Sequence, residues 1–269
     1  MSTIQPHNTK SAQTWAAGGI KYDKVSQSIT DAIAHCIKRI VPQPAEKILD
    51  IATGTGLGAR LLAQYGAEVT GIDIGADLID AATAIAKQQG YNIHFDVDDA
   101  ESLSFADYSF DNVVSTFGVM FVSNPEAAAA EIARVCKPGG KMALATWLPD
   151  STIAGLFKVM KPYQPIPVSG TSRVSPFDWG SIEKIKALFA ATFDLKFETG
   201  TTWLREADGA AVWELFVQGY GPTKSLAALL EPQQQEALKK DFIWFHEGFK
   251  TALGISMPRD YMITLGIRK

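Results

Sequence analysis

The architecture of this chain follows from one stretch of its sequence, Lys47-Ile48-Leu49-Asp50-Ile51-Ala52-Thr53-Gly54-Thr55-Gly56-Leu57-Gly58-Ala59-Arg60-Leu61-Leu62. The apolar run that opens this stretch, Ile48 to Ala52, is typical of a buried parallel strand. Gly54 and Gly56 then predict a tight turn whose backbone can come close to a ligand. The helix that begins near Leu57 directs free N–H groups and the positive end of its dipole at that turn. Strand, turn and helix together predict a nucleotide-binding site.

An acid at the end of the strand distinguishes between two kinds of nucleotide. Gly54, Gly56 and Ala59 also fit the spacing of a dinucleotide-binding turn. A pyrophosphate beside Asp50 would meet a like charge, whereas a cationic ligand would be attracted. S-adenosylmethionine (SAM) carries an ammonium and a sulfonium group and needs no phosphate cradle. A P-loop is excluded, because the stretch contains no Gly-Lys-Ser/Thr element.

The segment Leu49 to Gly56 resembles motif I of the class I SAM-dependent methyltransferases, in particular the type 11 enzymes related to ubiquinone and menaquinone biosynthesis. The family commonly has glycine where this chain has Ala52. The resemblance extends from about Trp15 to Trp147. It implies a Rossmann-like, doubly wound sheet of seven mostly parallel strands with an antiparallel edge strand. It also implies SAM as cofactor and S-adenosylhomocysteine (SAH) as product.

Strands and helices alternate along the first half of the chain, which predicts a parallel sheet covered on both faces. Further strands are expected at 68–73, 93–97, 110–116 and 141–147, with helices at 28–40, 77–89 and 124–136. The proline-rich segment 148–176 predicts little regular structure beyond a short helix near 153–160. A helix is expected at 181–193, strands at 195–204 and 261–267, and helices throughout 210–254.

This pattern suggests two parts. Residues 1–147 form a SAM-binding core with an N-terminal cover segment. Residues 148–269 complete the sheet and, by the family resemblance, add a helical cap over the substrate. Met1 to Gln13 is polar and expected to fray. Trp15 to Tyr22 has two interpretations that stay open here: it lies across the cofactor mouth, as in related methyltransferases, or it only packs the first helix.

Three acids follow successive strands, at the sheet edge where open α/β sheets bind ligands. Asp73 is placed to accept both hydroxyls of a ribose. By the resemblance, Asp99 accepts from the adenine amine and Asp50 acts by charge at the methionyl end. The residues expected to bind the cofactor are Tyr22, Asp50, Ala52, Thr53, Gly54, Gly56, Asp73, Ile74, Leu78, Asp99, Ala100, Thr116 and Phe117.

The methyl acceptor is specified less well than the cofactor. Met120 and Phe121 follow the fourth strand and are expected at the meeting point of cofactor and acceptor. The cap aromatics Trp213 and Trp244 either line an apolar acceptor site or form the core of the cap. His246 is a weak candidate base, because a lone histidine on a helix is more often packing than catalysis. No other candidate catalytic residue stands out.

Ser115-Thr116-Phe117-Gly118 differs from the Asn/Asp-Pro-Pro-Tyr/Phe element of family members that methylate amino groups of nucleic acids or protein glutamines. A formal charge of −4 over 269 residues also argues against a nucleic-acid partner. Two isolated cysteines predict neither a disulfide framework nor a zinc site.

No apolar run reaches the length of a membrane span or signal peptide, so a cytoplasmic protein is expected. The predicted function is methyl transfer to a small organic molecule, at an undetermined O, N or C atom. The alternatives are an NAD-linked oxidoreductase and a SAM-binding protein without catalysis.

Overall fold

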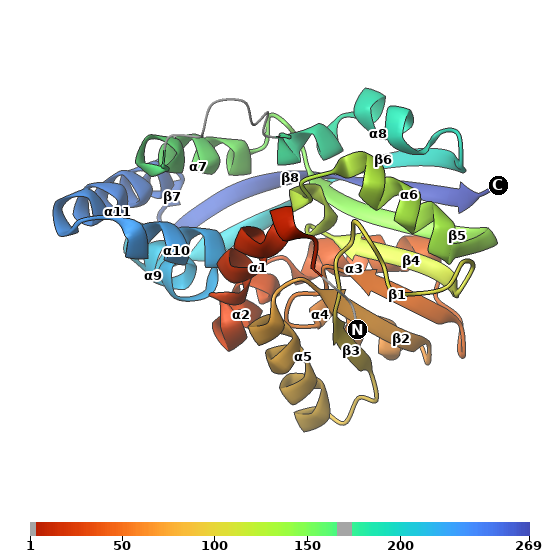
Figure 1. Cartoon of the computed structure of the whole chain (residues 1–269). Coiled ribbons are helices and arrows are strands. Elements are labelled where there is room, and N and C mark those ends of the chain that lie inside the picture. Colours follow the sequence, from red (N-terminus) through yellow and green to blue (C-terminus); the bar gives the residue numbers. More distant parts are fainter. Residues whose placement is uncertain (1–3, 166–173) are drawn as a thin grey trace.

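A twisted sheet runs through the centre of the computed structural model, which describes residues 4–165 and 174–269 (Figure 1). Within those residues the sheet has eight strands, in the order β3-β2-β1-β4-β5-β8-β6, with β7 paired to β8. The strands are β1 Lys47–Ile51, β2 Glu68–Asp73, β3 His94–Val97, β4 Phe110–Thr116, β5 Cys136–Trp147, β6 Phe193–Glu206, β7 Lys250–Thr251 and β8 Gly254–Arg268.

The strand directions confirm the predicted Rossmann-like, mostly parallel sheet. Strands β1 to β5 pair in parallel, whereas β8 runs antiparallel to both β5 and β6. The two late strands therefore lie together at one end of the sheet, as expected. The antiparallel strand β8 lies one position inside that end, and β6 forms the edge itself. Strand β1 is enclosed after its exposed first residue, Lys47, since Ile48, Leu49 and Ile51 have no exposed surface.

Helices cover both faces because the chain winds outward from β1 in two directions, and right-handed crossovers then place them on opposite sides. Helix α3 packs on α4, and α6 packs on α8. No helix in the described part of the chain is both long and apolar enough to cross a membrane. The α-helices are α1 Thr9–Ala16, α2 Tyr22–Gln27, α3 Thr30–Ile40, α4 Leu57–Ala63, α5 Ala76–Gln88, α6 Pro125–Val135, α7 Thr152–Met160, α8 Ile182–Phe189, α9 Gly209–Gly219, α10 Gly221–Leu229 and α11 Pro232–Glu247.

The helices after β6 gather at one end of the molecule (Figure 1). There α11 packs on α7 and α9, and α9 and α10 contact α2 and α1 from the N-terminal segment. The prediction of helix throughout 210–254 is wrong at its end. Helix α11 stops at Glu247, and a hairpin follows that turns at residues 252–253. Strand β8 then begins at Gly254, whose φ of 104° suits glycine. The late strands are correspondingly longer than expected.

Two further expectations are corrected. Residues 4–13 do not fray as a whole: a 3₁₀ turn at Pro6–Asn8 leads directly into α1, and Asn8 is buried. Strand β5 begins at Cys136, five residues early, because the turn around Gly139 is taken up as an irregularity in its pairing with β4. Residues 166–173 of the proline-rich segment lie outside the described residues.

Candidate active site

The glycine turn after β1 has the backbone that the sequence predicts. Gly54 and Gly56 have φ angles of 58° and 80°, which favour glycine. A Cβ on Gly54 would lie 2.9 Å from the ring of Tyr22, which would be too close. The side chain that packs against Gly54 therefore comes from the N-terminal segment. Sequence reasoning predicted the close approach but not this neighbour.

Ala52 marks the departure from the family pattern, and the structure shows its consequence. Its φ is 55°, a left-handed value that costs energy for a residue with a Cβ. Gly118 packs directly against it: a Cβ on Gly118 would lie 2.3 Å from the Cβ of Ala52. The side chain at position 52 is therefore accommodated by the missing side chain at position 118.

Asp73 ends β2 and holds the turn together. Its Oδ2 accepts a hydrogen bond from the Gly54 amide at 2.9 Å, and its Oδ1 accepts one from Gly75, also at 2.9 Å. Burial raises the pKa of this carboxyl to about 6. Each carboxylate oxygen has two lone pairs, so each can accept one further hydrogen bond. That capacity matches a pair of vicinal hydroxyls.

A cavity opens beside Asp73. We call it the acidic cavity, because four carboxylates contribute to its wall. It is lined by Asn8, Ser11, Trp15, Tyr22, Ile51, Ala52, Gly54, Ile72, Asp73, Ile74, Leu78, Asp98, Asp99, Ala100, Glu101, Phe117, Gly118, Val119, Phe121 and Val122. Nine of the thirteen residues expected at the cofactor are among them. The lining brings the N-terminal segment, the glycine turn and the ends of β2, β3 and β4 together.

Asp50 is the main exception among the expected cofactor residues. It lies under the glycine turn, outside the lining of the acidic cavity, and is 1% exposed. Its Oδ2 accepts from the hydroxyl of Thr53 at 2.7 Å, and burial raises its pKa to about 7. Asp50 therefore supports the turn from below, and its expected action by charge at the methionyl end stays a prediction. Thr53, Gly56 and Thr116 also lie outside the lining.

Asp99 is bonded on several sides. Its carboxylate accepts from Gln5 N at 2.9 Å, from Asn8 Nδ2 at 3.0 and 3.3 Å, and from Glu101 N at 3.0 Å. Glu101 in turn contacts His7 Nε2 at 2.7 Å through Oε2. The N-terminal segment is thus attached to the end of the cavity that was assigned to adenine.

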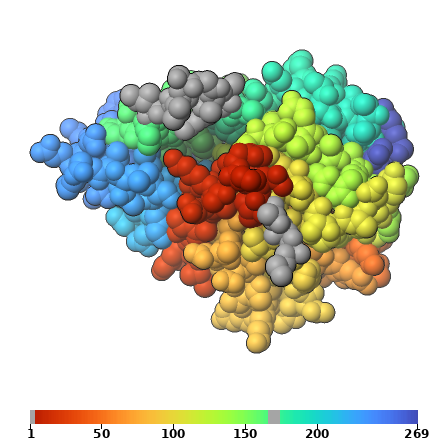
Figure 2. Space-filling model, viewed as in Figure 1, coloured from red at the N-terminus to blue at the C-terminus, as the bar shows by residue number. Residues whose placement is uncertain are grey.

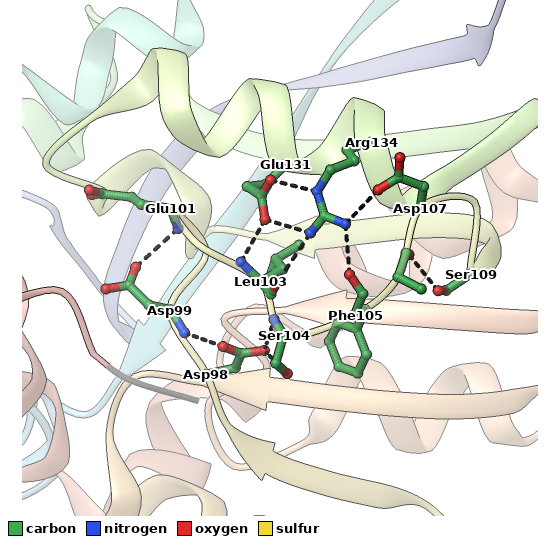
Figure 3. Close-up of polar contacts among 11 residues, drawn as sticks. Asp98, Asp99, Glu101, Leu103, Ser104, Phe105, Asp107, Ser109, Glu131 and Arg134 are labelled. Carbon is green, nitrogen blue, oxygen red and sulfur yellow. Dashed lines mark hydrogen bonds and ion pairs between the residues drawn. The ribbon is translucent and has the colours of Figure 1, made fainter. Parts of the chain in front are cut away.

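The loop between β3 and β4, which carries these acids, is braced from behind (Figure 3). Asp98 accepts from Ser104 N and Oγ at 3.0 and 2.8 Å. Arg134 on α6 binds Glu131 and donates to the carbonyl oxygen of Phe105 at 2.7 Å. The loop therefore holds Asp99 in place without a helix of its own. Asp111, near the start of β4, accepts from Lys47 N at 2.8 Å.

A second cavity lies next to the first. We call it the aromatic cavity. It shares Tyr22, Phe117 and Phe121 with the acidic cavity, so these three rings form the boundary. Its full lining is Tyr22, Val25, Ile29, Phe117, Phe121, Trp147, Ile153, Leu156, Phe157, Phe216, Tyr220 and Arg259. Trp147 stacks on Phe117 with ring centroids 4.0 Å apart.

The cap residues predicted for the acceptor lie elsewhere. The inner stripe of α11 is formed by Leu238, Phe242 and His246, four residues apart, and Trp244 on the opposite side is 78% exposed. The prediction that Trp244 lines the acceptor site is therefore corrected. Trp213 packs on Phe242 in the cap core, with ring centroids 5.3 Å apart.

Two other candidates are buried outside both linings. His246 has no exposed surface, and burial lowers its pKa to about 4. Met120 is 1% exposed. Sequence reasoning missed Phe157, Phe216, Tyr220 and Arg259. Arg259 lies two residues before the strand predicted at 261–267, so the alternation of that predicted strand did not mark it.

Comparisons with known proteins identify the domain that carries this site. Residues 49–144 match the family described as methyltransferase domain. Two uncharacterised proteins of Mycobacterium tuberculosis are 34% and 35% identical over 182 and 190 residues. These segments are 67% and 70% of this chain, and they span 66% and 68% of the two relatives. The demethylmenaquinone methyltransferase of Renibacterium salmoninarum is 34% identical over 46% of this chain and 53% of its own.

Solved structures share the fold. The YcgJ protein of Bacillus subtilis superposes with a TM-score of 0.62 at 19% identity, covering 89% of this chain and 98% of that one. A Haemonchus contortus phosphoethanolamine N-methyltransferase, in complex with SAH, has a TM-score of 0.57 at 19% identity. The superposition covers 88% of this chain and 52% of that enzyme.

The fold and the matched domain thus identify residues 49–144 as a member of the class I SAM-dependent methyltransferase family. The cofactor of this domain is SAM.

Proposed function

We propose that the protein transfers a methyl group from SAM to a small, ring-bearing organic acceptor held in the aromatic cavity. The observation that carries this proposal is the shared wall between the two cavities. Tyr22, Phe117 and Phe121 line both, so a ligand in the acidic cavity and one in the aromatic cavity would meet there. Partial identity to a demethylmenaquinone methyltransferase supports a ring as the acceptor.

The residues of the acidic cavity fit SAM. Asp73 would accept from the ribose hydroxyls and Asp99 from the adenine amine, while Ile74 and Leu78 supply apolar surface for the base. The acidic lining suits a cation, and within the described residues it includes no lysine or arginine to match a pyrophosphate. This argues against the NAD-linked alternative. Asp50, beneath the turn, would act through charge and by fixing Thr53.

When bound, SAM supplies an electrophilic methyl group on a sulfonium. The protein then has to align the acceptor and exclude water. Burial and the nearby Asp73 charge raise the pKa of Tyr22, so its hydroxyl stays protonated and can donate a hydrogen bond. Among the described residues that line the aromatic cavity there is no carboxylate and no histidine. We therefore favour an acceptor that ionises easily itself, such as an acidic phenol.

Calorimetry with SAH, SAM and NAD tests the cofactor half of the proposal. SAH and SAM should bind, and NAD should not. The acceptor half is tested with isotopically labelled SAM and a panel of phenols, quinols and amines, using Phe117→Ala as a variant with a disrupted boundary. Methylation of a phenol or quinol that falls in this variant is the expected result. Tight NAD binding, or labelled product unaffected by Phe117→Ala, would contradict the proposal.

A further inference from the structure

Arg259 is a buried cation in an otherwise apolar wall. It lies on β8, where the inward positions alternate through Met257, Arg259 and Tyr261, and it is 2% exposed. It contributes to the lining of the aromatic cavity, whose other members are apolar or aromatic. A charged side chain is almost never this buried unless it is paired.

The described partners of Arg259 are neutral. Nη1 donates to the Ser28 hydroxyl at 3.1 Å, and Nη2 donates to the Ser28 carbonyl oxygen. Nε is buried and has no hydrogen-bond partner among the residues that the structure describes. No ion pair within 4.0 Å connects Arg259 to a carboxylate in residues 4–165 and 174–269. Asp31, whose charge acts on Arg259, is exposed and accepts instead from Thr202 at 2.5 Å.

This charge persists at neutral pH. Burial lowers the pKa of Arg259, but only to about 10. The neighbouring His246 does not compensate, since burial and the positive charge of Arg259 lower its pKa to about 4 and keep it neutral. A buried charge without an opposite partner is strongly unfavourable. An anion that enters the aromatic cavity would remove that imbalance.

We propose that the methyl acceptor carries an anionic group, a carboxylate in the first instance, which pairs with Arg259 while its ring lies among the aromatic side chains. This inference rests on the proposed function and specifies its substrate class. A guanidinium has five N–H donors in a planar fork, and two of them are used by Ser28. The remaining donors include Nε–H, and an arginine fork matches a carboxylate with two parallel hydrogen bonds.

The arrangement orients the acceptor as well as attracting it. Arg259 lines the aromatic cavity but not the acidic cavity, whereas Tyr22, Phe117 and Phe121 line both. An acid held at Arg259 therefore leaves the other end of the ring free to approach the boundary, where the methyl group would arrive. Ring and acid are recognised by different walls, which gives selectivity against neutral rings of the same shape.

Arg268 provides a matched control. It lies on the same strand and donates to the carbonyl oxygens of Ala133 at 2.9 Å and Thr192 at 3.2 Å. It lines neither cavity. Arg268→Gln therefore removes an arginine with a structural role only, whereas Arg259→Gln removes one that also faces the acceptor site.

The test compares acids with their neutral amides. The protein is saturated with SAH, and binding of 4-hydroxybenzoate, salicylate and 3,4-dihydroxybenzoate is measured against that of the corresponding benzamides. For the native protein at least one acid should bind at least tenfold more tightly than its amide. In Arg259→Gln this preference should fall below twofold with SAH affinity unchanged, and in Arg268→Gln it should remain. Arg259→Met, which removes the charge but keeps an unbranched apolar side chain, provides the same comparison if the glutamine variant does not fold.

Two results would overturn the inference. The first is that no acid binds more tightly than its amide, whether or not the amide binds. The second is that the preference for acids over amides survives in a folded Arg259 variant that lacks the charge. Failure of the proposed function is distinguishable, because it would appear as absent SAH binding in the first step. Intact SAH binding without acid preference rejects only the role of Arg259.

Discussion

Asn8 donates through Nδ2 to both oxygens of the Asp99 carboxylate, at 3.3 and 3.0 Å, and so joins the start of the chain to the loop after β3. Gln5 N donates to the same carboxylate at 2.9 Å. Figure 2 shows the N-terminal residues, in red, lying at the surface between the cap and the core. The carboxylate proposed to hold adenine thus also fastens the segment that covers the cavity.

This relationship predicts that Asn8→Asp speeds cofactor release. A second carboxylate facing Asp99 replaces two hydrogen bonds with repulsion, so the N-terminal segment should detach more readily. We expect SAH to dissociate at least tenfold faster in stopped-flow displacement, with a smaller change in the association rate. Gln13→Ala, an exposed change on α1, the helix that begins directly after Asn8, is the control and should leave the rate unaltered. An unchanged dissociation rate in Asn8→Asp would show that the segment does not retain the cofactor.

The second prediction concerns Asp73. Asp73→Asn keeps the size of the side chain but removes its charge, and charge-assisted hydrogen bonds are worth about 1.5–3 kcal/mol. The dissociation constant for SAH should rise about ten- to hundredfold by calorimetry. Asparagine is preferred to alanine here because Asp73 is buried and accepts from Gly54 and Gly75, so truncation would also loosen the turn. Native affinity in a folded variant would remove Asp73 from the cofactor site.

Cofactor binding should also depend on pH through the same group. Burial raises the pKa of Asp73 to about 6, so in the free protein the carboxyl becomes protonated as the pH falls through that value. Ribose hydroxyls and a cationic cofactor favour the ionised form, so binding below pH 6 must release a proton. SAH affinity should be level above about pH 8 and fall by up to about tenfold per pH unit below 6. Asp73→Asn should lose the steep fall below pH 6, whereas Asp50→Asn should keep it and lose only a shallower fall near pH 7, where the Asp50 carboxyl titrates.

Much of the fold was predictable because it depends on local patterns. The glycine turn, the parallel strands and the acids after β2 and β3 follow from residue spacing, and the lining of the acidic cavity contains most of the expected residues. The position of Asp50 was not predictable, because one residue along a strand decides whether a side chain lies above or below the turn.

The acceptor half was less predictable for a different reason. Aromatic residues on a helix indicate burial of one face, but they do not say which element that face meets. Trp213 and Trp244 were equivalent in the sequence, yet one lies in the cap core and the other in solvent. The aromatic cavity is instead formed by residues distant in sequence, such as Tyr22, Phe157 and Arg259.

The contact between Ala52 and Gly118 predicts an energetic coupling. Gly118→Ala would place a methyl group 2.3 Å from the Ala52 Cβ and 2.9 Å from its carbonyl oxygen, so it should lower the free energy of unfolding by about 1–3 kcal/mol. Ala52→Gly alone should change the free energy of unfolding little. Glycine relieves the backbone strain of the positive φ at position 52, and this gain offsets the greater conformational freedom of glycine in the unfolded chain. In urea unfolding, the free energy lost by the double variant should be smaller than the sum of the two single losses by at least about 0.5 kcal/mol. Strictly additive effects would contradict the coupling.

The last prediction separates two aromatic residues of the acceptor half. Phe157 on α7 lines the aromatic cavity and lies parallel to Phe121, with ring centroids 6.2 Å apart. Trp244 on α11 is 78% exposed and lines neither cavity. Phe157→Ala should therefore raise KM for the acceptor at least tenfold, because it removes apolar wall worth about 1.5–3 kcal/mol to a buried ring. SAH affinity should change less than threefold, since Phe157 does not line the acidic cavity.

Trp244→Ala is the matched control for that measurement. Its loss should change both KM and stability by little, within about 0.5 kcal/mol, because exposed substitutions away from caps and cores rarely cost more. Steady-state kinetics with an acceptor from the labelled-SAM screen, together with urea unfolding of both variants, provides the comparison. If Trp244→Ala impaired turnover as strongly as Phe157→Ala, the outer face of α11 would have to approach the acceptor during the reaction, and the aromatic cavity would be only part of the acceptor site.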